Sequence, residues 1–249
     1  MAQLLKVSII TVCLNAEKCI EPCLRSTAEQ TYSNIEHVII DGQSTDRTLS
    51  IVNDYKRENT IVVSEKDAGI YDAMNKGLER ASGDIIYFLN SDDRLFDRSV
   101  IADIVNEYKK NESIDILLGK VVFEYPKTFK GPHGKMVDIS TKLDVFKYGL
   151  CHQRIFATRR VFSMIGNFNT QYRVCADQDW VFRALNKGFV LKNIDRYVAY
   201  FYGLGFHTQD QKLRINEKRL ALFKNSSLFE FITIACQSYL DGMLSSERT

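Results

Sequence analysis

The sequence lacks the features that mark several common classes of protein. Its 249 residues include three prolines, too few for a long proline-rich linker. No uncharged apolar run reaches the roughly 18 residues that a membrane-spanning helix needs. The amino-terminal segment has no signal-peptide hydrophobic region. These absences predict a cytoplasmic protein with reduced thiols.

Several ligand-binding motifs are also missing. None of the six cysteines forms a Cys-x-x-Cys pair, which disfavours a zinc site. Neither the Gly-x-Gly-x-x-Gly motif of dinucleotide folds nor the Gly-x-x-x-x-Gly-Lys-Ser/Thr loop occurs. The net charge of +2 is too small to indicate a nucleic-acid partner. A phosphate-bearing ligand would therefore need a metal ion to neutralise it.

The first half of the chain alternates strand and helix patterns. Hydrophobic residues make up 45% and charged residues 26%, an ordinary globular composition. The alternation predicts an α/β protein with a doubly wound, mostly parallel sheet. The predicted strands are 7–14, 35–40, 60–64, 85–89 and 114–118, and the predicted helices are 17–30, 45–55, 70–81 and 98–109, with Ser44 or Thr45 as the cap of the second helix.

The second half is more irregular. Residues 119–135 read as a hairpin or loop, in which 121–125 would be an antiparallel strand. A helix is predicted at 176–187, a strand at 196–202 and two carboxyl-terminal helices at 211–224 and 227–240. We therefore expect a nucleotide-binding half (1–118), a half that shapes the second substrate's pocket (119–208) and a helical extension (209–249).

Two adjacent carboxylates, Asp92 and Asp93, follow the apolar strand predicted at 85–89. Ligands of open α/β sheets bind at the carboxyl ends of the strands. Neighbouring carboxylates repel each other unless a cation or water separates them. Mg²⁺ and Mn²⁺ prefer oxygen ligands, including phosphates. The pair therefore predicts a metal–diphosphate site, and a solvated turn is the alternative.

Three other predicted strands end in polar or acidic residues. Asn15 and Glu17 follow the first strand, Asp41 the second and Asp67 the third. These side chains would share one edge of the sheet with the acidic pair. The segment from Asp41 to Asp46 predicts a tight turn into a helix that accepts donors from a nucleobase or ribose. A simple Asx turn with a helix cap is the alternative.

Four segments together resemble the family 2 glycosyltransferases of the GT-A fold. They are VSIITVCLN (7–15), DGQSTD (41–46), DAGIYDAMNKG (67–77) and NSDD (90–93). Their order and spacing match over about the first 100 residues, and the second half matches more loosely through His152, Gly166 and Asp177. The third segment resembles the bacterial polysaccharide-assembly branch. Asn90 departs from the acid that the family often carries there.

The resemblance implies a role for each residue of the donor site. Asp41 would accept from the uracil edge, Asp92 would meet the ribose or donor sugar, and Asp93 would bind the Mn²⁺ or Mg²⁺ ion that bridges the two phosphates. The remaining nucleoside-pocket residues implied are Thr11, Asn15, Glu17, Asp67 and Asn75.

Asp177 is the candidate general base. It lies in the first turn of the helix predicted at 176–187, where the helix dipole favours a carboxylate. A plain helix cap is the alternative role, and Asp179 is the runner-up as base. The family often has a Glu-Asp pair at this point, but here Ala176 precedes the Asp. Trp180 would pack against a sugar or in the core.

Further contacts are implied for two histidines and one helix. By resemblance, His152 would lie near the acceptor or phosphates, and His207 would reach the diphosphate or metal from a Gly-rich loop. The basic amphipathic pattern of 211–224 would either lie on an anionic membrane or pack on the domain with its charges solvated.

The expected function is that of a metal-dependent inverting glycosyltransferase. It would move a hexose from a UDP-sugar to a saccharide acceptor, expected to be lipid-linked, in bacterial surface-polysaccharide assembly (O-antigen, capsule or exopolysaccharide) at the inner face of the plasma membrane. Two rivals stay open: a nucleotidyltransferase on a similar fold, and a nucleotide-sugar-binding subunit without catalysis.

Overall fold

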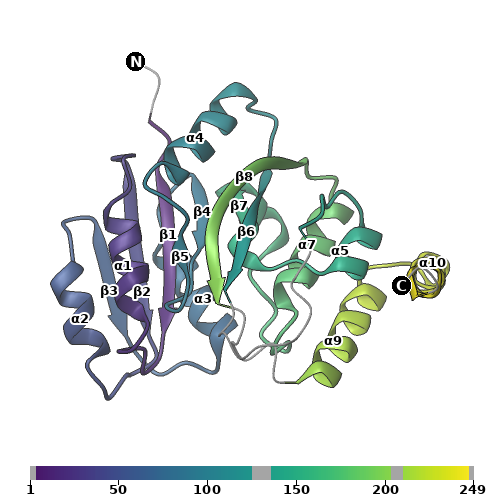
Figure 1. Cartoon of the computed structure of the whole chain (residues 1–249), viewed down its shortest axis with the longest axis horizontal. Coiled ribbons are helices and arrows are strands. Elements are labelled where there is room, and N and C mark those ends of the chain that lie inside the picture. Colours follow the sequence, from purple (N-terminus) through teal and green to yellow (C-terminus); the bar gives the residue numbers. More distant parts are fainter. Residues whose placement is uncertain (1–3, 125–135, 203–209, 247–249) are drawn as a thin grey trace.

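One sheet of eight strands organises the described part of the chain, and the four strands at one end of it pair in parallel (Figure 1). The computed structural model describes residues 4–124, 136–202 and 210–246, of which only the backbone for 242–246. The strand order is β3-β2-β1-β4-β7-β6-β8-β5. Because the first four of these are parallel, their carboxyl ends meet at one edge, as predicted. They are β1 (Val7–Cys13), β2 (Ile35–Asp41), β3 (Thr60–Ser64) and β4 (Ile85–Phe88).

The other half of the sheet is mixed. β7 (Ile155–Thr158) pairs antiparallel with β4 and with β6 (Ile116–Glu124). β8 (Leu191–Tyr202) runs parallel to β6 and antiparallel to the short β5 (Arg94–Leu95). β1, β2, β3, β4, β6 and β8 thus run in one direction, and β7 and β5 run against them. The mostly parallel sheet predicted from the sequence is therefore confirmed, with mixed pairing in its second half.

The separate antiparallel strand predicted at 121–125 is wrong. Residues 121–124 continue β6, which pairs parallel with β8 along its whole length. The pairing register shifts between Leu118 and Val121, where a side chain on Gly119 would collide with Val198. A glycine at such an irregularity lets one long strand bend without ending. Residue 125 lies outside the described residues.

Helices cover both faces of the sheet, so its strands are buried on both sides. On β4, Ile86 and Phe88 join the core under one face, while Ile85 and Tyr87 join the core under the other. The first face packs against α3 (Ile70–Arg80), α6 (Arg159–Ile165) and α7 (Ala176–Asn186). The second packs against α1 (Ile20–Ala28) and α4 (Val100–Lys110), with α2 (Thr48–Tyr55) beside α1.

The helix predicted from residue 45 begins later, at Thr48, and the predicted cap is wrong. The Ser44 hydroxyl accepts from the backbone N–H of Asn15 at 2.8 Å, and the Thr45 N–H donates to the Asn15 side chain at 2.9 Å. Asp46 instead accepts from the N–H of Thr48 at 2.9 Å. These residues are held in a loop because they tie the end of β1 to the end of β2.

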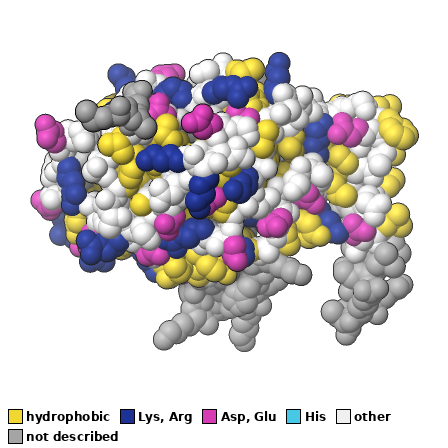
Figure 2. All heavy atoms as spheres, turned by 90° about the horizontal axis from the view of Figure 1, so that it is seen from above, with side chains coloured by type: hydrophobic (Ala, Val, Ile, Leu, Met, Phe, Trp, Pro, Cys, Tyr) yellow, Lys and Arg dark blue, Asp and Glu magenta, His cyan; other side chains and the backbone are white. Residues whose placement is uncertain are grey.

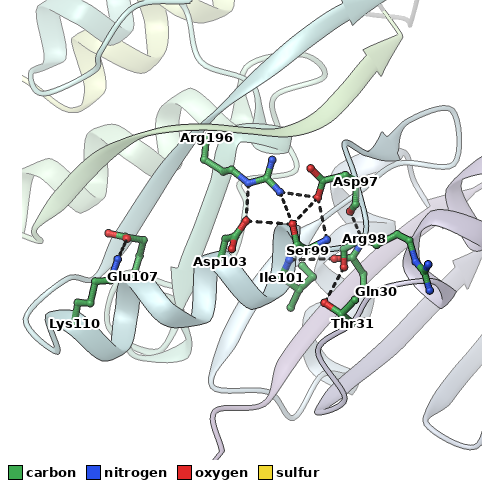
Figure 3. A network of polar contacts seen from close by, with 10 residues as sticks. All are labelled: Gln30, Thr31, Asp97, Arg98, Ser99, Ile101, Asp103, Glu107, Lys110 and Arg196. Carbon is green, nitrogen blue, oxygen red and sulfur yellow. Dashed lines mark hydrogen bonds and ion pairs between the residues drawn. The ribbon is translucent and has the colours of Figure 1, made fainter.

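A polar network fixes the segment that follows the acidic pair (Figure 3). Arg196 of β8 bonds to Asp97 at 2.6 Å and to Asp103 of α4 at 2.9 Å. On the other side, Gln30 donates to the Asp97 carbonyl at 2.6 Å and accepts from the Ile101 N–H at 3.1 Å. Residues 97–101 are therefore clamped between β8 and the loop after α1.

The last described helices lie beside the second half of the sheet. Between β6 and β7 the chain forms α5 (Lys142–Tyr148) and the short 3₁₀ helix η1 (His152–Arg154). α9 (Gln211–Lys224) packs against α7, and α10 (Leu228–Ser246) lies against α5 at the side of the molecule (Figure 1). Within residues 4–124, 136–202 and 210–246, no helix has the length and apolar character needed to cross a membrane.

Candidate active site

Asp93 is held from two sides inside the protein. Its side chain is buried, and its Oδ2 accepts from the Gln153 side chain at 2.7 Å. Its Oδ1 accepts from the backbone N–H of Tyr202, at the end of β8, at 3.0 Å. Burial, and then the charge of Asp92, raises the pKa of Asp93 well above its usual value. Both carboxylate oxygens are thus engaged by the fold itself.

Asp92 differs from its neighbour because its carboxylate is left open. It is partly buried, and among the described residues no side chain donates a hydrogen bond to it. Burial raises its pKa, while the nearby His152 ring lowers it. Two further polar atoms of this site, Asn90 Oδ1 and His152 Nε2, are buried and have no hydrogen-bond partner among the residues that the structure describes. Such atoms are the usual contacts of a ligand or ion.

His152 connects the acidic pair to the candidate base. Its Nδ1 lies 3.8 Å from Asp177 Oδ2, and its chain neighbour Gln153 holds Asp93. Asp177 lies in the first turn of α7, where its Oδ1 accepts from the next backbone N–H at 2.8 Å. The Tyr71 hydroxyl lies 3.5 Å from the same oxygen and donates at 2.8 Å to the Val174 carbonyl. Burial raises the pKa of Tyr71 well above 10, so its hydroxyl stays protonated.

Asp179, the runner-up for the base, is occupied by structural contacts. Its Oδ2 accepts from Arg183 at 2.9 Å and its Oδ1 accepts from Asn225 at 2.9 Å. The side chain is buried among helices α7 and α9. A carboxylate with both oxygens bound in this way cannot readily take a proton from a substrate, so the geometry favours Asp177.

The ends of β2 and β3 bring Asp41 and Asp67 together. Asp41 is fully buried, and its Oδ2 accepts from Ser64 at 2.6 Å and from the Ser44 N–H at 3.0 Å. Asp67 Oδ1 accepts from the Gly69 N–H at 2.9 Å. Its other oxygen lies over Gly42, so close that a side chain there would collide with it. A side chain at position 42 would therefore displace the Asp67 carboxylate from this position.

Asn15 and Glu17 organise the neighbouring loop. Asn15 accepts from the Thr45 N–H, and Glu17 accepts from the Arg47 N–H at 3.1 Å. Asn15 and Gln43 both have positive φ angles, 50° and 64°, and they are the two non-glycine residues in the described chain that do. Such strained residues cluster at ligand sites. Both lie just beyond the carboxyl ends of β1 and β2.

Two predicted site residues, Thr11 and Trp180, are buried, and a third, the half-buried Asn75, is tied to the backbone of Phe168. Thr11 is fully buried and bonds to His37 at 2.9 Å. Asn75 donates to the Phe168 carbonyl at 2.9 Å and accepts from its N–H at 3.0 Å, which ties α3 to the loop before α7. Trp180 packs in the core with Phe162, so the core alternative holds. His207 lies outside the described residues.

Sequence reasoning missed Gln153 and Tyr71. Gln153 is fully buried and holds Asp93. The one sequence feature that could have indicated this role is its position next to His152. Tyr71 stands on α3, over 100 positions before Asp177 in the chain. A contact between residues so far apart in sequence depends on how α3 and α7 pack, which local patterns do not report.

The family described as "Glycosyl transferase family 2" matches residues 8–176, more than half of the chain. The chain belongs to this family. It is 35% identical over 202 residues to the "PGL/p-HBAD biosynthesis glycosyltransferase" of Mycobacterium bovis, a match that covers 80% of this chain and 77% of that protein. TuaG of Bacillus subtilis, named for teichuronic acid biosynthesis, is 38% identical over 91 residues, 35% of this chain and 36% of TuaG.

Solved structures share the fold. S. aureus TarS 1–349 in complex with UDP-GlcNAc superposes with a TM-score of 0.74 at 21% identity, covering 94% of this chain and 71% of that one. A mannosyltransferase from Pyrobaculum calidifontis, in complex with GDP-Man and Mn²⁺, gives a TM-score of 0.63 at 17% identity, covering 98% and 76%. This chain spans 43% of the longer TarS chain.

The protein is therefore a family 2 glycosyltransferase with the GT-A fold, and its relatives are named for glycolipid and cell-wall biosynthesis. A separate cleft of about 670 Å³ lies between α4 and β8. Its lining includes Glu107, which is already paired with Lys192 at 2.9 Å, and no residue of the acidic edge. The acidic edge is thus the better candidate for the active site.

Proposed function

We propose that this family 2 glycosyltransferase transfers a hexose from a UDP-sugar to a hydroxyl group of a lipid-linked saccharide, with inversion and with a divalent cation. The observation that carries the proposal is the contact chain from Asp93 through Gln153 and His152 to Asp177. It brings a carboxylate pair suited to a cation next to a carboxylate suited to deprotonating an acceptor.

The donor side would be built at the ends of β1 to β4. Asp67 would flank the nucleoside, with the exposed Leu14 as an apolar surface beside it, and the fully buried Asp41 would support the turn beneath them. Asn15 and Glu17 support the same edge by holding its loop. The UDP and UDP-GlcNAc named in the TarS structures favour a UDP-sugar as donor.

The acidic pair fits Mn²⁺ or Mg²⁺. Asp92 carries an open carboxylate, and the buried Asn90 Oδ1 has no hydrogen-bond partner among the described residues. Burial raises the pKa of both Asp92 and Asp93, and the charge of Asp92 raises that of Asp93 further. A cation there would be held by Asp92 together with the donor phosphates, with Asp93 behind it. The resemblance had assigned the metal to Asp93 rather than to Asp92. We exchange these roles because Asp93 is engaged by Gln153 and Tyr202. When bound, the ion supplies charge neutralisation for the leaving diphosphate.

Asp177 would take the proton of the acceptor hydroxyl as that oxygen attacks the anomeric carbon. The bond to UDP breaks on the opposite face of the sugar, which inverts the anomeric configuration. His152 lies near both Asp92 and Asp177. It would therefore orient the base and contact the donor diphosphate. The named roles of the relatives in glycolipid and teichuronic acid biosynthesis support a bacterial envelope saccharide as acceptor.

Calorimetric titration with UDP tests the donor site. We expect wild-type protein to bind UDP in Mn²⁺, and expect binding at least about tenfold weaker in EDTA or in Asp92→Ala. Asp54→Asn, an exposed carboxylate on α2, is the matched control and should bind as wild type. Equal binding of UDP by folded wild type and Asp92→Ala, with and without metal, would exclude the proposed cation site. Release of UDP from a panel of UDP-hexoses then identifies the sugar.

A further inference from the structure

α10 is apolar on both sides: Phe231 and Ile234 pack against the domain, and a second apolar arc faces solvent. The exposed residues include Leu228 (66%), Phe229 (82%), Ile232 (51%) and Tyr239 (69%). At 100° per residue these positions, with Cys236 and Leu240, fall within one arc of the helix. Apolar side chains appear along the outer side of α10, at the right of Figure 2. The outward side of a surface helix is normally polar.

The two acidic residues of α10 form ion pairs with lysines on the side that faces α5. Glu230 pairs with Lys142 at 2.9 Å, and Asp241 pairs with Lys147 at 2.8 Å, both lysines belonging to α5. The outward arc of residues 228–241 carries no charged side chain. These two ion pairs fix the rotation of α10, so its apolar arc is held outward by specific contacts with α5.

The outward face of α9 is basic and apolar. Lys212, Ile215, Arg219 and Phe223 are exposed and follow one another at helical spacing. Its acidic residue, Glu217, points inward and accepts three backbone N–H bonds from residues 173–175. Neither Lys212 nor Arg219 forms an ion pair with a described residue. Phe223 contacts Phe231 of α10, with ring centroids 5.4 Å apart, so the two faces adjoin.

We propose that the α9–α10 surface docks on a membrane that contains anionic phospholipids. The apolar arc of α10 would enter the headgroup–acyl boundary, and Lys212 and Arg219 of α9 would meet lipid phosphates. Charge favours this partner over a second copy of the chain, because a symmetric contact through α9 would oppose its uncompensated cations. The inference goes beyond the proposed chemistry and depends on none of the donor-site residues.

Flotation with lipid vesicles tests the proposal. We expect the full chain to float with vesicles of phosphatidylcholine and phosphatidylglycerol, and to do so weakly with phosphatidylcholine alone. Lys212→Gln combined with Arg219→Gln should weaken partitioning by about 30-fold, since each cation near an anionic surface contributes about 1 kcal/mol. Phe229→Ser combined with Ile232→Ser should weaken it more than about tenfold on both vesicle types.

Matched controls carry the same changes elsewhere on the surface. Met164→Ser with Val190→Ser alters two exposed apolar residues, and Lys56→Gln with Arg57→Gln alters two exposed cations. Both control pairs should float as wild type. Circular dichroism and thermal melting of every variant show whether it is folded, and a separate UDP titration distinguishes failure of docking from failure of the proposed donor site.

Three outcomes would overturn the proposal. One is a folded wild-type protein that stays off anionic vesicles at low salt. A second is sedimentation without lipid showing a dimer that Phe229→Ser with Ile232→Ser converts to monomer, which would assign the surface to a second copy. Equal flotation of the α9–α10 variants and the controls would likewise exclude this surface.

Discussion

At the scale of single residues, the two neighbouring carboxylates of the acidic pair differ in their hydrogen bonds. Asp92 keeps open oxygens, whereas Asp93 is fastened by Gln153 and by the end of β8. The same contrast distinguishes Asp177 from Asp179, which Arg183 and Asn225 hold. Identical side chains one or two positions apart thus have different roles because of the partners that packing gives them.

We expect Asp92→Asn and Asp93→Asn to affect different measurements. Asp92→Asn should lower Mn²⁺-dependent UDP affinity by about tenfold or more while leaving thermal stability near wild type. In Asp93→Asn the Gln153 amide can turn, presenting its unpaired Oε1 to the new amide, so most of the UDP affinity should persist. Asp93→Leu would leave Gln153 unsatisfied and cost about 1–3 kcal/mol of unfolding free energy. Greater loss of metal affinity in Asp93→Asn than in Asp92→Asn would reverse the assignment.

Asp177→Asn should lower kcat by about 10²- to 10⁴-fold, the usual contribution of a general base. UDP affinity by calorimetry should stay unchanged, since Asp177 faces the acceptor side. Asp179→Asn is the comparison: it weakens the contacts to Arg183 and Asn225, so it should lower the melting temperature and keep kcat within about tenfold. A proficient Asp177→Asn enzyme would require another base.

At the scale of elements, α3 packs on the sheet through a glycine. A side chain on Gly77 would collide with Ile10 of β1 and would crowd Ile40 of β2, 3.3 Å away. This close approach sets the distance between α3 and the sheet. It also positions the start of α3, with Tyr71 toward Asp177 and Asp72 accepting from the Ala68 N–H at 2.9 Å.

Gly77→Ala should destabilise the protein by about 1 kcal/mol in urea unfolding. Overpacking costs about 1–3 kcal/mol and outweighs the gain of about 1 kcal/mol in helix propensity. Since the collision is with Ile10, adding Gly77→Ala to Ile10→Ala should be neutral or stabilising. The same loss in both backgrounds would mean that the contact with Ile10 is not the cause.

At the scale of the whole molecule, one buried acid joins three parts of the first half. Glu36 of β2 accepts from Ser8 of β1 and pairs with Lys6 at 2.6 Å. It also accepts from Ser82 at 2.7 Å and from the Gly83 N–H at 3.1 Å, just after α3. Burial alone would raise the pKa of Glu36, but these hydrogen bonds together lower it to about 2.

This lowered pKa makes stability depend on pH. The unfolded carboxyl group titrates near 4.5, so its contribution is complete above that pH and is lost as pH falls toward about 2. Glu36→Gln should cost about 2 kcal/mol at neutral pH, after allowance for solvent around Lys6, and much less near pH 2. Unfolding of both proteins across this range measures the difference. If the unfolding free energies of the two proteins differ by the same amount at every pH, ionisation of Glu36 is not the cause of the lost stability.

The sequence determined the first half of the fold and its acidic edge. Short apolar runs alternating with amphipathic helices predict β1 to β4 within one or two residues, because strand and helix periodicity are local properties. The ends of parallel strands then bring Asn15, Asp41, Asp67 and Asp92 to one edge. The family resemblance points to Asp177 as the candidate base. From the sequence, Asp179 stayed the runner-up for that role.

Only the tertiary structure decided which polar residues are available to a ligand. Thr11 is buried, the half-buried Asn75 is bonded to Phe168, Asp93 is held by Gln153, and α10 has an apolar arc that faces solvent. The mixed half of the sheet could not be predicted from the sequence either. β6 and β8 pair across some 75 residues, and no local pattern specifies a partner strand. Long-range pairing and packing decide burial, and burial decides which of several equivalent acids can act.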